Sequence, residues 1–167
     1  MKRFLLIGIL AAVACSGPTE PTPESRVLFS ADFENGVLNE WVYTYCRPSI
    51  ENDGDNYLLL TANEYCSSYF EFRHYFGFIG GNPAGTLKTL DVSFAYKTAG
   101  ISYGRVYVTG GNFTMQTFEP SPEWRKVKFQ PAKAEWPTSF TMGLAGFGSY
   151  RPGVALAVDD IKVTAIY

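Results

Sequence analysis

The sequence predicts an all-β fold in which two antiparallel sheets pack face to face as a sandwich. From Val27 onward, short stretches alternate apolar and polar residues with a period of two, and none keeps the 3.6-residue period of a helix. Clusters of Gly, Pro, Asn and Asp separate these stretches. Phe and Tyr, which favour pleated strands, are frequent, with 13 Phe and 11 Tyr among 167 residues. About ten strands in ~140 residues is the size of a two-sheet sandwich.

The alternation is clearest in residues 68–76. Four side chains on one face, Tyr69, Glu71, Arg73 and Tyr75, are polar or amphipathic, whereas the other face carries Phe70, Phe72, His74 and Phe76. The same pattern occurs in 91–97, 105–109 and 139–144, and it is typical of antiparallel sheets that are buried on one side. Further strands are expected at 27–33, 41–46, 57–61, 115–119, 124–129 and 154–167.

The last strand contains a change of parity. Leu156 and Val158 share one face, but Ile161 and Val163 would share the other face of a regular strand. The inward side therefore switches across Asp159 and Asp160, which predicts a β-bulge there.

The N-terminus has the features of a targeting segment. Lys2 and Arg3 precede a run of eleven apolar or small residues, 4–14, which is too short for a membrane span of about 20 residues. Cys15 follows directly, and this arrangement resembles a bacterial lipobox, although Ala12 stands where Leu is usual. The resemblance implies that residues 1–14 are a signal peptide, that Cys15 is lipidated and that the protein is anchored at the bacterial outer membrane or cell surface. The alternative is a plain secretory signal beside a coincidental cysteine.

A tether and a single domain are expected after the cleavage site. Residues 16–25 contain three prolines and no aliphatic or aromatic side chain, so 15–26 are expected to form an extended spacer and 27–167 the sandwich domain. With Cys15 lipidated, Cys46 and Cys66 remain as a pair in an oxidising compartment. We expect a disulfide between them, contributing roughly 3 kcal/mol. Two free buried thiols are the alternative.

Three segments together resemble the galactose-binding-like jelly-roll family, the fold of many non-catalytic carbohydrate-binding modules. They are Asp-Phe-Glu-Asn-Gly at 32–36 followed by Trp41, the strands at 90–98 and 105–108 followed by Glu-Trp-Arg-Lys at 123–126, and Val-Asp-Asp-Ile-Lys-Val at 158–163. The resemblance spans residues 27–167 and implies a jelly roll in which Trp41 and Trp124 belong to the core.

The resemblance also implies a structural calcium ion. In many members of this family the ion lies where the opening Glu meets the closing Asp pair, and the matching residues here are Glu34 and Asp159. Carboxylate and carbonyl oxygens are the ligands that calcium prefers. The alternative is that both carboxylates only accept hydrogen bonds from turns.

No enzyme is expected from the sequence. The only histidine, His74, shares a face with phenylalanines, and no zinc-site spacing, G-x-S-x-G motif or P-loop occurs. Asp159 and Asp160 are adjacent, and Glu71 shares a face with Arg73, so neither arrangement suits the paired carboxylates of a glycosidase. A net charge of −2 without a basic run argues against nucleic acid as a partner.

A binding surface is easier to assemble from these residues. Sugars are bound by aromatic rings that stack on their C–H faces and by polar groups that fix their hydroxyls. We predict ligand-binding roles for one set of residues: Tyr43, Tyr45, Tyr69, Glu71, Arg73, Arg105, Tyr107 and Trp136. The expected function is a surface-anchored, non-catalytic module that binds a glycan, and the membrane is contacted only through the lipid. The alternative is an adhesion or surface-assembly lipoprotein that binds a protein partner.

Overall fold

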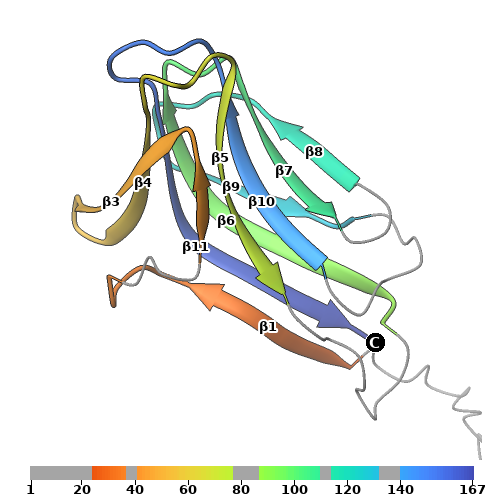
Figure 1. The fold of residues 1–167 in the computed structure, drawn as a ribbon. Coiled ribbons are helices and arrows are strands. Elements are labelled where there is room, and N and C mark those ends of the chain that lie inside the picture. The colour runs from red at the N-terminus through yellow and green to blue at the C-terminus, as the bar shows by residue number, and fades with distance from the viewer. Residues whose placement is uncertain (1–23, 37–40, 77–86, 110–113, 132–139) are drawn as a thin grey trace, which may run out of the picture.

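The computed structural model describes residues 24–36, 41–76, 87–109, 114–131 and 140–167. This part of the chain contains eleven strands and no helix, and the strands form two antiparallel sheets that pack as a sandwich (Figure 1). The predicted all-β sandwich is therefore confirmed. In the same residues, no helix has the length and hydropathy needed to cross a bilayer.

The larger sheet has six strands. Their order is β3 (Cys46–Asn52), β4 (Asn56–Ala62), β11 (Ala155–Ile166), β6 (Thr89–Ala99) and β9 (Arg125–Phe129), with β1 (Ser25–Ala31) paired to the second half of β11. The two chain segments at the ends of the domain lie together, since the Tyr167 N–H donates a hydrogen bond of 2.8 Å to the Glu24 carbonyl.

The smaller sheet has five strands. Their order is β2 (Val42–Thr44), β5 (Tyr69–Phe76), β10 (Phe140–Phe147), β7 (Tyr103–Thr109) and β8 (Thr114–Phe118). The central neighbours in this sheet are distant in sequence, because β10 inserts between β5 and β7.

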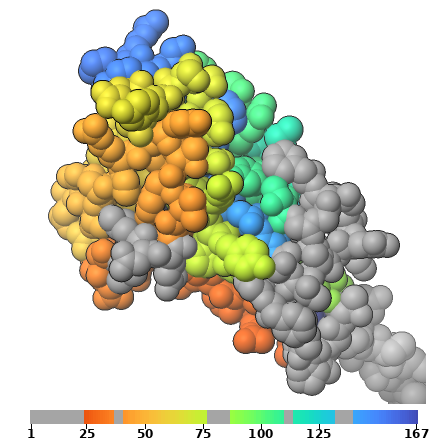
Figure 2. Space-filling model, viewed as in Figure 1, coloured from red at the N-terminus to blue at the C-terminus, as the bar shows by residue number. Residues whose placement is uncertain are grey.

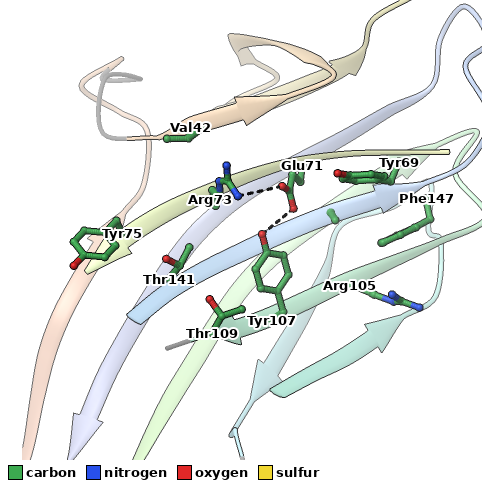
Figure 3. A pocket seen from close by; sticks show the side chains of 11 residues that line it. Val42, Tyr69, Glu71, Arg73, Tyr75, Arg105, Tyr107, Thr109, Thr141 and Phe147 are labelled. Atoms are coloured by element: carbon green, nitrogen blue, oxygen red, sulfur yellow. Dashed lines mark hydrogen bonds and ion pairs between the residues drawn. The ribbon is translucent and has the colours of Figure 1, made fainter. Parts of the chain in front are cut away.

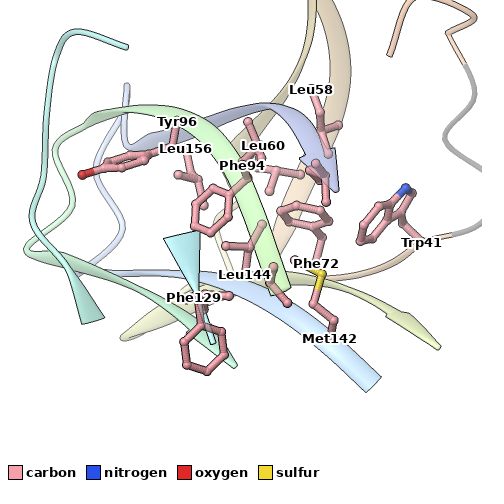
Figure 4. Packing of buried hydrophobic residues seen from close by; sticks show 14 of the residues in the cluster. Trp41, Leu58, Leu60, Phe72, Phe94, Tyr96, Phe129, Met142, Leu144 and Leu156 are labelled. Carbon is pink, nitrogen blue, oxygen red and sulfur yellow. The ribbon is translucent and has the colours of Figure 1, made fainter. Parts of the chain in front are cut away.

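The core lies between the two sheets and is filled by the inward face of each strand. Leu58, Leu60 and Leu156 from the six-stranded sheet meet Phe72 and Leu144 from the five-stranded sheet, and all five are inaccessible to solvent (Figure 4). Burial of a side chain of this size contributes about 1.5–3 kcal/mol. The predicted parity of 68–76 and 139–144 is confirmed, since the buried residues of β5 and β10 are the apolar ones.

The expected single strand at 41–46 is two strands in different sheets. Tyr45 has a left-handed backbone (φ 58°) and separates β2, in the smaller sheet, from β3, in the larger one. Strand β3 was not predicted, because Pro48 and the polar residues around it give no alternation. The proline is tolerated because β3 is an edge strand.

The predicted bulge in the last strand is confirmed. Asp159 pairs with Ala95 and Lys162 with Ser93, so three steps along β11 match two along β6. Asp160 has φ 51° and is the residue at which the parity of β11 changes.

The structure does not show the predicted disulfide: Cys46 and Cys66 are free, buried thiols. Each thiol donates a hydrogen bond to a different carbonyl: Cys46 Sγ to that of Glu71, within β5, at 3.4 Å, and Cys66 Sγ to that of Gly148, directly after β10, at 3.8 Å. Burial raises the pKa of Cys46 to about 12 and also raises that of Cys66, so both thiols stay protonated.

Candidate binding site

The outward face of the five-stranded sheet carries a cleft of about 570 Å³ (Figure 3). Its lining comes from four strands: Val42 from β2; Tyr69, Glu71, Arg73 and Tyr75 from β5; Thr141, Ala145 and Phe147 from β10; and Arg105, Tyr107 and Thr109 from β7. In the space-filling view, β10 shows as a blue strip between β5 and β7 (Figure 2).

The cleft exists because the middle strand carries small outward side chains. Thr141 and Ala145 of β10 line its floor, and Gly143 between them lies under the ring of Tyr107. The strands on either side place larger residues opposite them: Ala145 lies between Glu71 and Arg105, and Gly143 between Arg73 and Tyr107. Large side chains on both sides of a low strand leave a trough over β10, which the ring of Tyr107 crosses at Gly143.

A row of aromatic rings closes one end of the cleft. Phe147 lies opposite Tyr69 on one side and Tyr103 on the other. Its ring stacks on Tyr103, with centroids 4.6 Å apart, and on Tyr69 at 5.8 Å. Tyr45 extends the row with an edge contact to Tyr69 at 5.7 Å. We call Tyr45, Tyr69, Phe147 and Tyr103 the aromatic row.

The polar centre of the cleft is Glu71. The Tyr107 hydroxyl donates a hydrogen bond of 2.7 Å to Glu71 Oε2, and Arg73 Nη1 lies 3.8 Å from Oε1 (Figure 3). The Glu71 side chain is only 12% exposed, whereas that of Arg73 is 48% exposed. Burial, followed by the hydrogen bond to Glu71, raises the pKa of Tyr107, so its hydroxyl remains a donor. This carboxylate therefore holds neighbouring side chains in place.

Arg105 takes a different position from Arg73. Its guanidinium carbon lies 4.6 Å from the Phe147 ring centroid and 5.2 Å from that of Tyr103. Arg105 and Glu71 flank Ala145 of β10 on opposite sides. The guanidinium group of Arg105 is nevertheless turned away from the Glu71 carboxylate (Figure 3). Its Nε is buried and has no hydrogen-bond acceptor among the described residues.

The structure brings together five of the predicted binding residues, namely Tyr69, Glu71, Arg73, Arg105 and Tyr107. Tyr45 lies beside them through Tyr69. Tyr43 does not line the cleft: it packs against the core, where burial raises its pKa to about 12, and Val42 faces the cleft in its place. Trp136 lies outside the described residues.

Sequence reasoning missed Phe147 and Tyr103 as site residues. Phe147 was not recognised because the predicted strand ended at residue 144, although β10 continues to Phe147. Tyr75 was predicted on the correct face of its strand but was not included in the site. It has the same parity as Tyr69, and this shared parity would have identified it as a cleft residue.

The three other aromatic predictions have mixed outcomes. Trp41 is a core residue as expected, and His74 packs between Phe29, Trp41 and Phe76. Trp124, also expected in the core, is 38% exposed and lies on the six-stranded sheet side. There Lys97 Nζ is 4.8 Å from its ring centroid and forms an ion pair with Asp53.

The residues predicted to hold calcium lie among like charges. Glu34 accepts hydrogen bonds from the Asn56 backbone N–H (3.0 Å) and side-chain amide (3.1 Å), and the Asp55 carboxyl raises the pKa of Glu34. Burial, and after it the charges of Asp160, Asp55 and Asp32, raise the pKa of Asp159 to about 6.

These carboxylates do not by themselves make a calcium site. No group of three or more His, Cys, Asp or Glu side chains among the described residues is placed to hold a metal ion. Glu34 is occupied by Asn56, and Asp159 Oδ1 accepts the Asp160 N–H at 2.7 Å. Calcium at Glu34 and Asp159 therefore stays a prediction that needs carbonyl ligands as well.

No protein-family model and no curated protein sequence matches this chain. Solved structures do match it. TmCBM61, solved in complex with β-1,4-galactotriose, is 15% identical over 83% of this chain and 97% of its own, with a TM-score of 0.56. The CBM22-1 xylan-binding domain from Paenibacillus barcinonensis is 15% identical over 87% of this chain and 98% of its own, with a TM-score of 0.58.

An enzyme with the same fold is also similar. A Stig cyclase from Fischerella sp. is 9% identical over 85% of this chain and 98% of its own, with a TM-score of 0.60. At such identities the likeness concerns the fold and not the activity. The chain thus has the β-sandwich fold that carbohydrate-binding modules share with at least one enzyme.

Proposed function

We propose that the chain is a non-catalytic carbohydrate-binding module and that the cleft over β10 holds the glycan. The observation that carries this proposal is the trough itself: small residues form its floor, and aromatic and polar side chains stand along both sides. Its volume falls in the usual range for small-ligand sites. Neighbours in fold that bind galactotriose and xylan support the same class of ligand.

The side chains fit the two requirements of sugar binding. Tyr75 and Val42 expose apolar side-chain surface at one end of the cleft, and the aromatic row lies at the other end. Such surfaces stack on the C–H faces of pyranose rings. Glu71 holds Arg73 and Tyr107 between these two ends. Arg73 can donate to a sugar hydroxyl, and the Tyr107 oxygen, whose hydrogen goes to Glu71, can accept from one. Groups fixed before binding lose little conformational entropy when the ligand arrives.

Glu71, a single carboxylate that is already paired, favours binding over catalysis. Glycoside hydrolysis uses two carboxyl groups on either side of the scissile bond. Glu71 is the one carboxylate among the described residues that line the cleft, and it is paired with Arg73 and Tyr107.

The proposal includes lipid anchoring through Cys15 at a bacterial outer membrane or cell surface. The start of β5 and the end of β10, which carry Tyr69 and Phe147, lie at the opposite end of the sandwich from the start of β1 (Figure 1). Strand β6 spans the distance between the two ends. Its first residue, Thr89, pairs with Ile166, which lies near Glu24, where the chain enters. Its last residue, Ala99, is followed shortly by Tyr103 of the aromatic row. Chains anchored through the N-terminus would hold the aromatic row outward.

Affinity electrophoresis against a panel of soluble polysaccharides tests the glycan proposal. Tyr75→Ala should weaken binding about fivefold, since loss of one stacked ring costs on the order of 1 kcal/mol. Tyr65→Ala is the matched control: Tyr65 is 72% exposed and Tyr75 65%, but Tyr65 does not line the cleft. Retarded migration on no polysaccharide would contradict glycan binding and favour a protein ligand instead.

A further inference from the structure

The cleft has an excess of positive charge that the composition does not explain. The whole chain has a net charge of −2, yet the described lining of the cleft contains Arg73 and Arg105 against one carboxylate, Glu71. A local charge opposite in sign to that of the chain attracts ligands of the chain's own sign.

Arg73 and Glu71 largely offset one another. Glu71 Oε1 faces Arg73 Nη1 at 3.8 Å, and Oε2 receives the Tyr107 hydroxyl. Both carboxylate oxygens are therefore engaged by residues other than Arg105, and Glu71 forms no ion pair with Arg105. The positive excess belongs to Arg105.

Arg105 is held in position without an acid partner. No carboxylate among the described residues forms an ion pair with it, and its Nε is buried without an acceptor. The rings of Phe147 and Tyr103 lie against its guanidinium group at 4.6 and 5.2 Å. A guanidinium group kept beside two rings is partly desolvated, and an unpaired charge in such surroundings gains much from an anion.

We propose that the cleft binds an acidic glycan, one that contains uronic acid residues, and that Arg105 binds the sugar carboxylate; this inference rests on the proposed function. The guanidinium group is planar and matches a planar carboxylate with two parallel hydrogen bonds. The aromatic row beside Arg105 provides the apolar surface on which the same sugar ring stacks. The aromatic row thus supplies apolar contact to the sugar, and Arg105 selects for its charge.

The test compares acidic polysaccharides with the same polymers after chemical reduction of their carboxyl groups. Polygalacturonate, alginate and glucuronoxylan are the acidic probes, measured with the wild-type protein by isothermal titration calorimetry. At least one acidic polymer should bind about tenfold or more tightly than its reduced form, because a hydrogen-bonded charge is lost. Its affinity should also fall as NaCl is raised, since the exposed part of the contact is screened.

Two variants assign the effect to Arg105. Arg105→Gln should abolish the preference for the acidic form, and Arg105→Lys, which keeps the charge but not the planar group, should recover only part of it. Arg47→Gln makes the same change of charge on the exposed edge strand β3 and should leave binding unchanged. Melting curves establish that each variant is folded.

The outcomes separate the two proposals. Equal affinity for acidic and reduced polymers, or binding of neutral glycans alone, would overturn the role of Arg105 and leave the glycan-binding proposal in place. Binding of sulfated polymers alone would overturn the uronate assignment. Failure to bind any polysaccharide would overturn the proposed function, and the inference with it.

Discussion

Tyr107 and Gly143 lie side by side on β7 and β10, and the ring of Tyr107 occupies the space that a side chain at 143 would need. A Cβ atom on Gly143 would lie 2.2 Å from Tyr107 Cζ and 2.3 Å from its hydroxyl oxygen. Tyr107 thereby crosses β10 and bonds Glu71 on β5, the strand beyond (Figure 3). A glycine in the middle strand is what allows one polar contact to span three strands.

Gly143→Ala should therefore disrupt the cleft while leaving the core intact. The new methyl group displaces the Tyr107 ring, and the hydrogen bond of 2.7 Å to Glu71 is lost. We expect glycan affinity to fall, because the displaced Tyr107 ring alters the shape of the cleft and frees Glu71 from its fixed position. Gly148→Ala is the control, because a Cβ there meets nothing closer than 3.4 Å. Equal affinities of the two variants would show that Tyr107 does not need its present position.

Asp159 should make the stability of the domain depend on pH. Its folded-state pKa of about 6 is raised from 3.8, so the folded protein binds a proton more tightly than the unfolded chain does. The contribution of this group is fully present below about pH 4 and is lost as the pH rises through about 6. Asp159→Asn, which keeps the acceptor for the Asp160 N–H, should be ~1–2 kcal/mol more stable than the wild type at pH 7.5, and this difference should vanish toward pH 4.

Calcium binding at Asp159 would change the melting temperature of the wild type but not that of Asp159→Asn. If the ion binds at Glu34 and Asp159, millimolar calcium should raise the melting temperature of the wild type at pH 7.5, because it binds only the folded state. The Asp159→Asn variant should not respond. Identical melting curves in calcium and in EDTA would contradict the calcium prediction, whereas a less stable Asp159→Asn protein in EDTA would contradict the raised pKa.

The two cysteines of the domain should behave as buried thiols. In a chain that begins at Ser16, a thiol reagent at pH 8 should react slowly with the native protein, because Cys46 and Cys66 are buried and burial raises the pKa of each. Denaturation should then release two reactive thiols per chain. A peptide linking Cys46 to Cys66 in a non-reduced digest would be the contrary result.

The lipid anchor is tested by Cys15→Ser. We expect this variant to leave the membrane fraction and to lose metabolic labelling with palmitate, because serine does not form the thioether. Cys46→Ser serves as a control for loss of a thiol elsewhere in the chain. Labelling that persists without Cys15 would show that residues 1–15 do not act as a lipobox.

The face that each side chain occupies could be predicted from the alternation of apolar and polar residues, because the strand period of two is a property of the backbone. The faces of Tyr69, Glu71 and Arg73 were predictable from the phenylalanines between them. The same reasoning gave Arg105 and Tyr107 from the valines of β7 and placed the bulge at Asp159 and Asp160.

Where the pattern breaks, the prediction failed for a local physical reason. The left-handed backbone at Tyr45 moves the chain from one sheet to the other, so the single strand expected at 41–46 became β2 and β3. Tyr43 accordingly faces the core and Val42 the cleft. A positive φ at tyrosine leaves no signal in the residue types around it.

The sequence by itself determined the all-β class and which side chains of each strand face outward. The tertiary structure decided which strands are neighbours: β10 lies between β5 and β7, so Glu71, Gly143 and Tyr107 meet although they are far apart in the chain. It also decided that Cys46 and Cys66 bond different carbonyls and that Trp124 is exposed. The physical reason is that inward and outward alternation is local, whereas strand order depends on long-range pairing and packing of whole faces.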